Sequence, residues 1–310
     1  MRRGCPNACG VAVPGEDART DSPKGAADLV VVGMGPAGVA CVLQAAREGL
    51  RVVAIADQPA GGLLPAARRL DNLPGWPGGV GGAVLARRMA RQVAACPATL
   101  VPGTVVSLRP GPGGFEVGLQ DGRCLATRTV CVASGTRPAP LPWRVAGDAM
   151  PARDVRDLPR GLAGRRVVVI GGGDAAFDTA LTAADRGAEV VVLVRGKVPR
   201  AAPGLLGEAA AAGIDLRVGV FVDALSCFRG MWRVLAGPGG ELTADHVVAC
   251  VGRVPRDDLI QGIDGHAGAF VAGDVHRGAQ RFAALAMGDG QAAALAAVTA
   301  IRGRGDERRR

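Results

Sequence analysis

The chain has 310 residues, of which 48% are hydrophobic and 21% are charged. These proportions are typical of a globular protein with enough apolar material for about two domains of ordinary size. The net charge is +9, with part of the excess at the ends of the chain, and two interpretations stay open: a compositional bias with solvated tails, or attraction to an acidic partner. Only 3% of the residues are aromatic and none is Tyr, whereas proteins that bind nucleic acids commonly stack bases on aromatic rings. We therefore expect no nucleic-acid partner.

The two ends of the chain are expected to lie outside the folded part. Residues 1–27 carry Gly, Pro, Ser and Asp without periodicity, which predicts a flexible leader. The leader has no apolar segment like that of a signal peptide, and no apolar run of membrane-spanning length stands out. We expect a cytoplasmic protein with no membrane insertion and with a basic tail over residues 303–310.

Cysteine and histidine spacing indicates neither a disulfide framework nor a metal site. The eight cysteines contain no Cys-x-x-Cys pair, and a chain of this length does not need disulfides to fold. Cys5 and Cys9 are close in sequence, and two interpretations stay open for them: a redox dithiol or part of a metal site, or residues of a flexible segment. His246, His266 and His276 share no metal-ligand spacing.

A glycine motif follows the first apolar run of the chain. Residues 29–32 predict a buried strand, which ends at Gly33-x-Gly35-x-x-Gly38 before an alanine-rich helix over residues 37–48. In a dinucleotide-binding turn, the first glycine permits the tight turn and the second lets a pyrophosphate approach the backbone. The third lets the helix pack closely on the strand. The motif therefore predicts a nucleotide site at a helix N-terminus.

The same pattern occurs a second time. Residues 166–170 predict a strand, which is followed by Gly171-Gly-Gly173-Asp-Ala-Ala176 and by a helix over residues 175–186. Two strand–turn–helix units in one chain predict two nucleotide sites.

The residues that end the next strand of each unit carry opposite charges. Asp57 follows a strand over residues 50–56 and stands 19 residues after Gly38, where an acid hydrogen-bonds an adenosine ribose. Arg195 stands 19 residues after Ala176, where an arginine can pair with a 2′-phosphate. Lys197 and Arg200 add positive charge nearby. We expect NADPH rather than NADH at the second turn, with NADH possible.

The remaining elements alternate between helix and strand patterns, which predicts parallel sheets. In chain order they are a helix over 83–95, strands over 103–108, 115–119 and 123–132, a connector over 138–164, strands over 189–194, 214–221, 230–235 and 245–251, a loop over 257–266, a short strand over 269–272 and a helix over 281–300.

Several spaced motifs together resemble the two-dinucleotide flavoproteins of the pyridine nucleotide-disulfide oxidoreductase superfamily, above all the low-molecular-weight thioredoxin reductases. The resemblance covers about residues 28–300. Besides the two glycine turns, the motifs are Asn72-Leu-Pro-Gly75, Ala133-Ser-Gly135, Gly252-Arg-Val-Pro255 and Gly268-Ala-Phe-Val-Ala-Gly-Asp274, with Arg281 in the place of an arginine beside the flavin.

The resemblance implies an α/β fold with two Rossmann-like, three-layer dinucleotide-binding domains. The FAD-binding domain would span residues 28–150 and 253–302, with the NAD(P)-binding domain inserted over residues 151–252. The residues implied for FAD are Gly33, Gly35, Pro36, Ala37, Gly38, Asp57, Asn72, Gly135, Gly273, Asp274 and Arg281. Those implied for NADPH are Gly171, Gly173, Asp174, Ala175, Ala176, Arg195 and Arg200.

The chain departs from the family where the substrate would be recognised. Asp154-Val-Arg-Asp157 stands where the redox dithiol is expected, and Leu63 and Phe282 replace two glutamines expected near the flavin. Asp154 and Asp157 are open to two interpretations: proton donors near the flavin, or salt-bridge partners within a linker.

The resemblance therefore implies an FAD-dependent oxidoreductase that passes electrons from NADPH to a separate acceptor, such as a ferredoxin or another redox protein. Relatives of this size imply a homodimer. Two alternatives stay open: a thioredoxin-disulfide reductase that uses Cys5 and Cys9 or the thiols of a partner, and a non-catalytic nucleotide sensor or assembly subunit.

Overall fold

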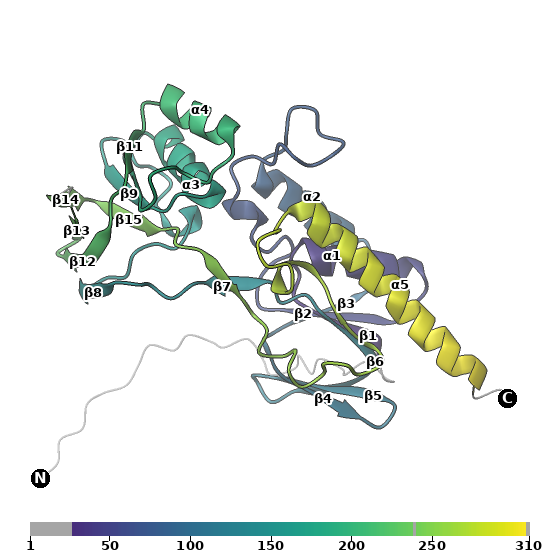
Figure 1. Ribbon diagram of the computed structural model, residues 1–310. Coiled ribbons are helices and arrows are strands. Elements are labelled where there is room, and N and C mark those ends of the chain that lie inside the picture. The colour runs from purple at the N-terminus through teal and green to yellow at the C-terminus, as the bar shows by residue number, and fades with distance from the viewer. Residues whose placement is uncertain (1–26, 238–239, 308–310) are drawn as a thin grey trace, which may run out of the picture.

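The computed structural model describes residues 27–237 and 240–307, which form two lobes joined by a pair of crossing strands (Figure 1). Cys5 and Cys9, with nearly all of the expected leader and the last three residues of the basic tail, lie outside the described residues.

The first lobe is built on a seven-stranded sheet in the order β3-β2-β1-β6-β5-β4, with β17 also paired to β6. Its parallel strands are β1 (Ala27–Val32), β2 (Val52–Ala56), β3 (Thr99–Pro102), β6 (Cys124–Val132) and β17 (Ala269–Val271). β4 (Val105–Gly111) and β5 (Gly114–Leu119) form an antiparallel hairpin at the edge. Three helices belong to this lobe: α1 (Pro36–Arg47), α2 (Gly82–Ala94) and α5 (Ala283–Glu307).

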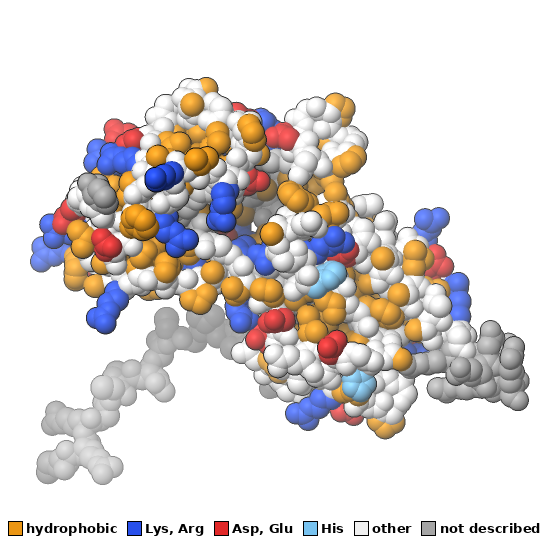
Figure 2. Space-filling view, in the orientation of Figure 1, with side chains coloured by type: hydrophobic (Ala, Val, Ile, Leu, Met, Phe, Trp, Pro, Cys, Tyr) orange, Lys and Arg blue, Asp and Glu red, His pale blue; other side chains and the backbone are white. Residues whose placement is uncertain are grey.

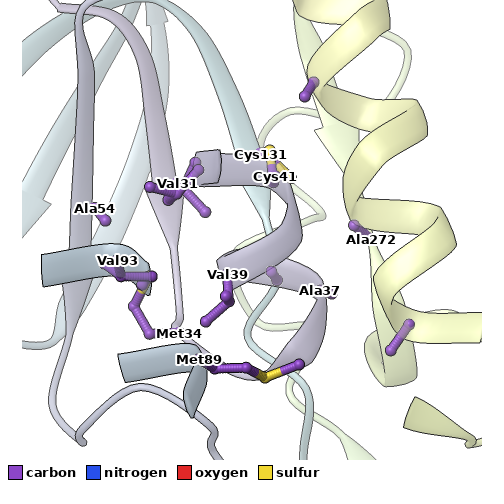
Figure 3. Packing of buried hydrophobic residues seen from close by; sticks show 14 of the residues in the cluster. Val31, Met34, Ala37, Val39, Cys41, Ala54, Met89, Val93, Cys131 and Ala272 are labelled. Atoms are coloured by element: carbon purple, nitrogen blue, oxygen red, sulfur yellow. The ribbon is translucent and has the colours of Figure 1, made fainter. Parts of the chain in front are cut away.

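The core of the first lobe lies on both faces of this sheet. On one face, Val31, Ala54 and Cys131 pack against apolar residues of the helices (Figure 3). On the other face, Val30 and Val53 pack against residues of the β4–β5 hairpin. Buried on both faces, β1 is a run of aliphatic side chains, as expected for a central parallel strand. The carboxyl end of β1 is thereby held rigidly where the glycine turn begins.

The second lobe has a sheet covered by helices on one face and by another sheet on the opposite face. The four parallel strands follow the order β11-β10-β9-β15, and they are β9 (Arg166–Ile170), β10 (Glu189–Val194), β11 (Asp215–Val218) and β15 (His246–Ala249). The helices are α3 (Asp174–Asp185) and α4 (Pro203–Ala211). The covering sheet contains β8 (Arg144–Gly147), β12 (Val222–Phe228), β13 (Met231–Ala236) and β14 (Gly240–Ala244).

Two short strands connect the lobes. β7 (Thr136–Pro138) leads out of the first lobe, and β16 (Arg253–Pro255) returns to it as its antiparallel partner (Figure 1). Three short 3-10 helices stand near this crossover: η1 (Leu64–Ala66), η2 (Val155–Asp157) and η3 (Gly273–Val275). The second lobe is thus inserted between two parts of the first.

The structure corrects several boundaries expected from the sequence. β8 lies before residue 151, yet it pairs with β12, so the chain enters the second lobe between β7 and β8. α5 continues to Glu307, through most of the expected basic tail. The two nucleotide sheets are parallel as expected, but the β4–β5 and β12–β14 segments are antiparallel. Helix α4 and strands β3, β7, β8, β12, β14 and β16 were not expected.

Part of α5, Ala283–Gly303, is long and apolar enough to cross a membrane. In the structure this helix packs along α1, and 39% of its most apolar 18-residue stretch is buried inside the protein. Gly290 makes the close approach possible, because a Cβ at this position would lie 2.0 Å from the Ala37 oxygen. Core helices of soluble domains can be equally long and apolar, so the length and composition of α5 do not decide whether it enters a membrane. The absence of membrane insertion stays a prediction.

Candidate functional site

The first glycine turn is a backbone cradle with room for a ligand on one side. Gly33 has a φ of +95°, and a Cβ there would lie 2.5 Å from the carbonyl oxygen of Ala133. A Cβ at Gly38 would lie 1.9 Å from the Gly33 oxygen, so the helix can begin this close to the strand only with glycine. Gly35 differs, because a Cβ there would meet nothing within 4 Å. The turn is therefore tight inside and open at Gly35.

Helix α1 starts directly from this open position. Gly35 is its N-cap and makes no side-chain capping bond, while Pro36 occupies the first helical position with Ala37 after it. The first N–H groups of a helix have no partner within the helix and attract anions together with the helix dipole. These residues form the local structure that a pyrophosphate group requires.

The distant motif at residues 273–274 lies against the same turn. Gly273 has a φ of +79°, and a Cβ there would lie 2.7 Å from the Cβ of Ala37 in the first turn of α1. Asp274 follows it at the start of η3, and burial raises the pKa of its carboxyl, opposed by the positive charges of Arg281 and Arg253. The fold thus brings Asp274 to the first glycine turn, as the resemblance implies.

Arg281 carries the observation that best fits a bound flavin. One of its Nη atoms donates to the carbonyl oxygen of Arg253 at 2.9 Å. Its Nε is buried and has no hydrogen-bond partner among the described residues. A buried guanidinium N–H without a partner costs free energy, so it calls for an acceptor from elsewhere. The open cradle at Gly35 and this donor fit a polar, anionic cofactor such as FAD.

Three other residues expected at the flavin site contribute less in the structure. Asp57 is exposed immediately after β2, on the carboxyl edge of the sheet where the first turn lies, which suits contact with a ribose. Asn72 is exposed in the loop before α2, with no hydrogen bond to the described residues. Gly135 has a φ of +67° beside the crossover, and its oxygen accepts from the Arg256 N–H at 3.0 Å.

The second glycine turn repeats the arrangement of the first. Gly171 has a φ of +152°, and a Cβ there would lie 2.4 Å from the Cys250 oxygen. Gly173 is the N-cap of α3, and a Cβ there would meet nothing within 4 Å. Ala176, in the third motif position, is buried, with Ala175 exposed before it. The open position again stands at a helix N-terminus.

The side chain of Asp174 forms a hydrogen bond within the protein. Its carboxylate accepts the N–H of Ala202 at 2.8 Å. The neighbouring Arg200 N–H donates to the Gly172 oxygen at 2.6 Å. These two bonds tie the segment before α4 to the second turn, so the backbone of Arg200 is anchored beside it.

The cations expected to bind a 2′-phosphate are exposed and unpaired. Arg195 follows β10 directly, on the strand next to β9 and its glycine turn. The side chains of Arg195, Lys197 and Arg200 are exposed, and none forms an ion pair with another described residue. By contrast, Arg217 of the adjacent strand β11 is paired with Asp215 at 2.7 Å. An unpaired basic group here is available to an anion.

The position of the expected dithiol holds an ion pair. Asp154 caps η2 and binds Arg156 at 2.7 Å, which holds the pKa of the Asp154 carboxyl below its ordinary value although burial opposes this. The second lobe also contains the thiol of Cys250, which lies close enough to Asp154 to feel its charge. Burial raises the pKa of this thiol to about 11. Of the two interpretations, the structure supports a salt-bridge partner for Asp154, whereas Asp157 accepts the backbone N–H of Arg153 at 2.9 Å.

Sequence reasoning missed Asp289, on the inner side of α5. Its carboxylate accepts the Gly273 N–H at 3.1 Å, faces His276 Nε2 at 3.1 Å and pairs with Arg277. The Arg277 bond lowers the pKa of Asp289 to about 2. The side chain of His276 is therefore held at Asp289. The Gly288-Asp-Gly290 sequence within an apolar helix was the available signal.

Comparisons with known proteins agree with this geometry. The family model for pyridine nucleotide-disulphide oxidoreductases matches residues 27–290. A ferredoxin–NADP reductase of Acidiphilium cryptum is 32% identical over 67% of this chain and 66% of its own length. The NADPH-dependent thioredoxin reductase 3 of Arabidopsis thaliana is 27% identical over 87% of this chain and 57% of its own length.

Solved structures show the same fold. A thioredoxin reductase of Lactococcus lactis in its FR conformation superposes with a TM-score of 0.80 at 19% identity, covering 89% of this chain and 99% of that one. A thioredoxin reductase of T. acidophilum superposes with a TM-score of 0.76 at 23% identity, covering 87% and 97%. The chain spans about half the length of the first curated relatives that it matches. By its fold and the family model, it belongs to the pyridine nucleotide-disulphide oxidoreductases, a family of FAD- and NAD(P)-dependent oxidoreductases.

Proposed function

We propose that the protein is an FAD-dependent oxidoreductase that takes electrons from NADPH and passes them to a separate redox protein. The observation that carries the proposal is the pair of open glycine turns, at Gly35 and Gly173, each at a helix N-terminus in its own lobe. Curated relatives named ferredoxin–NADP reductase and thioredoxin reductase support the same reaction class.

The protein's own residues bind and orient the two nucleotides. The N–H groups at the start of α1, with Asp274, Arg281 and Asp57, would hold FAD in the first lobe. The start of α3, with Arg195 and the neighbouring basic side chains, would hold NADPH in the second. When bound, FAD supplies the ability to accept a hydride, that is two electrons and one proton, and to release those electrons to another acceptor.

A separate acceptor fits the chemistry around the crossover. An ion pair occupies the expected dithiol position, and the Cys250 thiol, with its pKa near 11, stays protonated at neutral pH and is a poor nucleophile. On the face shown in Figure 2, Lys and Arg side chains gather over the second lobe and around the junction of the lobes. Such a surface attracts an acidic protein, as a ferredoxin-like partner would require.

The unpaired Arg195 supports NADPH as the electron donor. A charge-assisted hydrogen bond contributes about 1.5–3 kcal/mol, which corresponds to roughly a 10- to 100-fold change in affinity. We expect Arg195→Ala to lower kcat/KM for NADPH by that factor and to leave NADH nearly unaffected. Arg217→Ala is the matched control, because Arg217 lies on the adjacent strand β11 and is paired with Asp215. Equal losses with both nucleotides would show that Arg195 does not select the 2′-phosphate.

Stopped-flow mixing of the flavin-loaded protein with NADPH tests the proposal. We expect rapid bleaching of the flavin, followed by reoxidation with a ferredoxin and not with thioredoxin. Reoxidation by thioredoxin would favour the alternative that uses Cys5 and Cys9 or a partner's thiols. A protein that cannot be loaded with FAD, or whose flavin is not bleached, would refute the proposal and favour the sensor interpretation.

A further inference from the structure

One segment contacts both the first glycine turn and the helix that begins at the second glycine turn. The bridging segment, defined here as residues 61–71, runs between β2 and α2 and lies beside α3 and α4 of the second lobe (Figure 1). Its role follows neither from the family motifs nor from the two nucleotide sites. Its two ends make different kinds of contact.

The first end of the bridging segment rests on the first glycine turn. The Gly61 N–H donates to the Met34 oxygen at 2.8 Å. A Cβ at Gly62 would lie 2.9 Å from the Cα of Gly35, so the two backbones touch directly. This end therefore moves with the turn that would hold the pyrophosphate of FAD.

The second end is anchored to the helix that starts at the second glycine turn. The Arg68 N–H donates to the Asp178 carboxylate at 2.8 Å, and the Arg69 N–H reaches the same carboxylate. Asp178 lies in α3, four residues or about one helical turn after Asp174. Burial raises the pKa of Asp178, against the effect of these bonds, so the contact lies in a sheltered part of the junction.

Ion pairs reinforce the same end. Arg68 binds Asp185 at 2.6 Å and Glu208 at 2.7 Å, while Arg69 binds Glu208 at 2.6 Å. The Arg68 side chain is 25% exposed and that of Glu208 is 32% exposed. Isolated surface pairs contribute little to stability, but a shared carboxylate in a half-buried network holds its partners in a defined geometry.

From these contacts we infer that Arg68 and Arg69 are positioning residues, which hold the second glycine turn at a fixed distance and orientation from the first. The inference rests on the proposed function, since it gives this coupling a purpose. Electron transfer between two bound groups requires that they be aligned within a fraction of an ångström. The chain itself passes between the lobes through two short strands, β7 and β16. The bridging segment supplies a third, non-covalent connection between the lobes, through its contacts with α3 and α4.

Two contacts at the crossover act in the same direction. Arg253 of β16 donates to the Thr136 hydroxyl at 2.8 Å and to its carbonyl oxygen at 2.9 Å, which clips the two linking strands together. Arg156 of η2 reaches the Gly62 oxygen at 3.5 Å, so the second lobe also touches the first end of the bridging segment. The lobes are held on both sides of the crossover.

The test compares the double variant Arg68→Ala/Arg69→Ala with the wild type. We expect the rate of flavin reduction by saturating NADPH to fall at least tenfold, with KM for NADPH nearly unchanged, because the nucleotide sites themselves stay intact. A second readout does not depend on catalysis. Hydrogen exchange at the backbone N–H groups of residues 68 and 69 should become at least tenfold faster, and X-ray scattering should show a larger radius of gyration.

Two further variants separate positioning from folding. Arg68→Lys/Arg69→Lys keeps both positive charges and should restore most of the rate. Arg165→Ala is the matched control, because Arg165 pairs with Asp245 at 2.9 Å entirely within the second lobe. A double alanine variant with wild-type reduction rate, exchange and scattering would overturn the inference. If NADPH does not reduce the flavin of the wild type, the proposed function fails, while exchange and scattering still decide whether this segment couples the lobes.

Discussion

Gly35→Ala separates the folding role of the first turn from its binding role. Gly35 has φ −68° and ψ −176°, values that alanine adopts without strain, and a Cβ at this position meets nothing within 4 Å. We therefore expect the free energy of unfolding of the flavin-free protein to change by no more than about 0.5 kcal/mol. The added methyl group would instead occupy the open side of the cradle, where the pyrophosphate must approach the backbone.

The size of the binding loss follows from the contacts that the methyl group would block. Each hydrogen bond to a charged group contributes about 1.5–3 kcal/mol, so losing one or two weakens FAD binding by about 3 kcal/mol, on the order of 100-fold. Titration of the flavin-free protein with FAD measures the dissociation constant, and thermal unfolding of the same sample reports folding.

Gly173→Ala is the matched variant in the second lobe, because its Cβ position is equally open at the N-terminus of α3. It should weaken NADPH binding and leave the FAD content unchanged. The reasoning is refuted if Gly35→Ala binds FAD as tightly as the wild type, or if it loses FAD only because the protein unfolds.

The remaining predictions concern α5. Gly290→Ala should destabilise the protein by about 3 kcal/mol, because its Cβ would lie 2.0 Å from the backbone oxygen of Ala37. Gly288→Ala, whose Cβ would have nothing within 4 Å, should be neutral or stabilising by up to about 1 kcal/mol. Urea unfolding compares the two variants, and similar stabilities would contradict the packing argument. The folded-state pKa of Asp289, about 2, lies below the ordinary value of 3.8 for an aspartate, so its pairing with Arg277 stabilises the protein above about pH 4. About 2 kcal/mol of that stability is lost as the pH falls towards 2. Asp289→Asn should remove most of this pH dependence, which urea unfolding at a series of pH values measures. A free energy of unfolding that changes with pH in the variant as it does in the wild type would be the contrary result.

The local parts of the fold could be predicted because each is coded within a short stretch. An aliphatic run before a glycine motif has one good solution, since the strand is buried on both faces and the turn needs φ values open to glycine. Both nucleotide turns, at Gly33 and Gly171, were therefore placed correctly with their helices. The family motif also singled out Gly273, although its close approach to Ala37 depends on the whole lobe.

The features that were missed depend on tertiary partners. α4 is a nine-residue helix with mostly exposed side chains, so it has no clear apolar stripe in the sequence. β3, at the edge of its sheet, is a strand of four mostly exposed residues. Asp289 gains its role only when α5 lies against η3, and Asp178 only when the bridging segment reaches it from another lobe. Apart from the two glycines that flank Asp289, these pairings leave no short-range pattern in the sequence.

Under the proposed function, the opposite charges after β2 and β10 would give the two equivalent turns different roles. Both turns present the same open glycine and helix N-terminus, so the backbone alone would accept either nucleotide. The exposed side chains of Asp57 and Arg195 follow the strand next to each turn. A carboxylate repels a 2′-phosphate that an arginine attracts, so NADPH is disfavoured in the first lobe and favoured in the second. This charge difference supports a flow of electrons from the second lobe to the first, across the junction that Arg68 and Arg69 span.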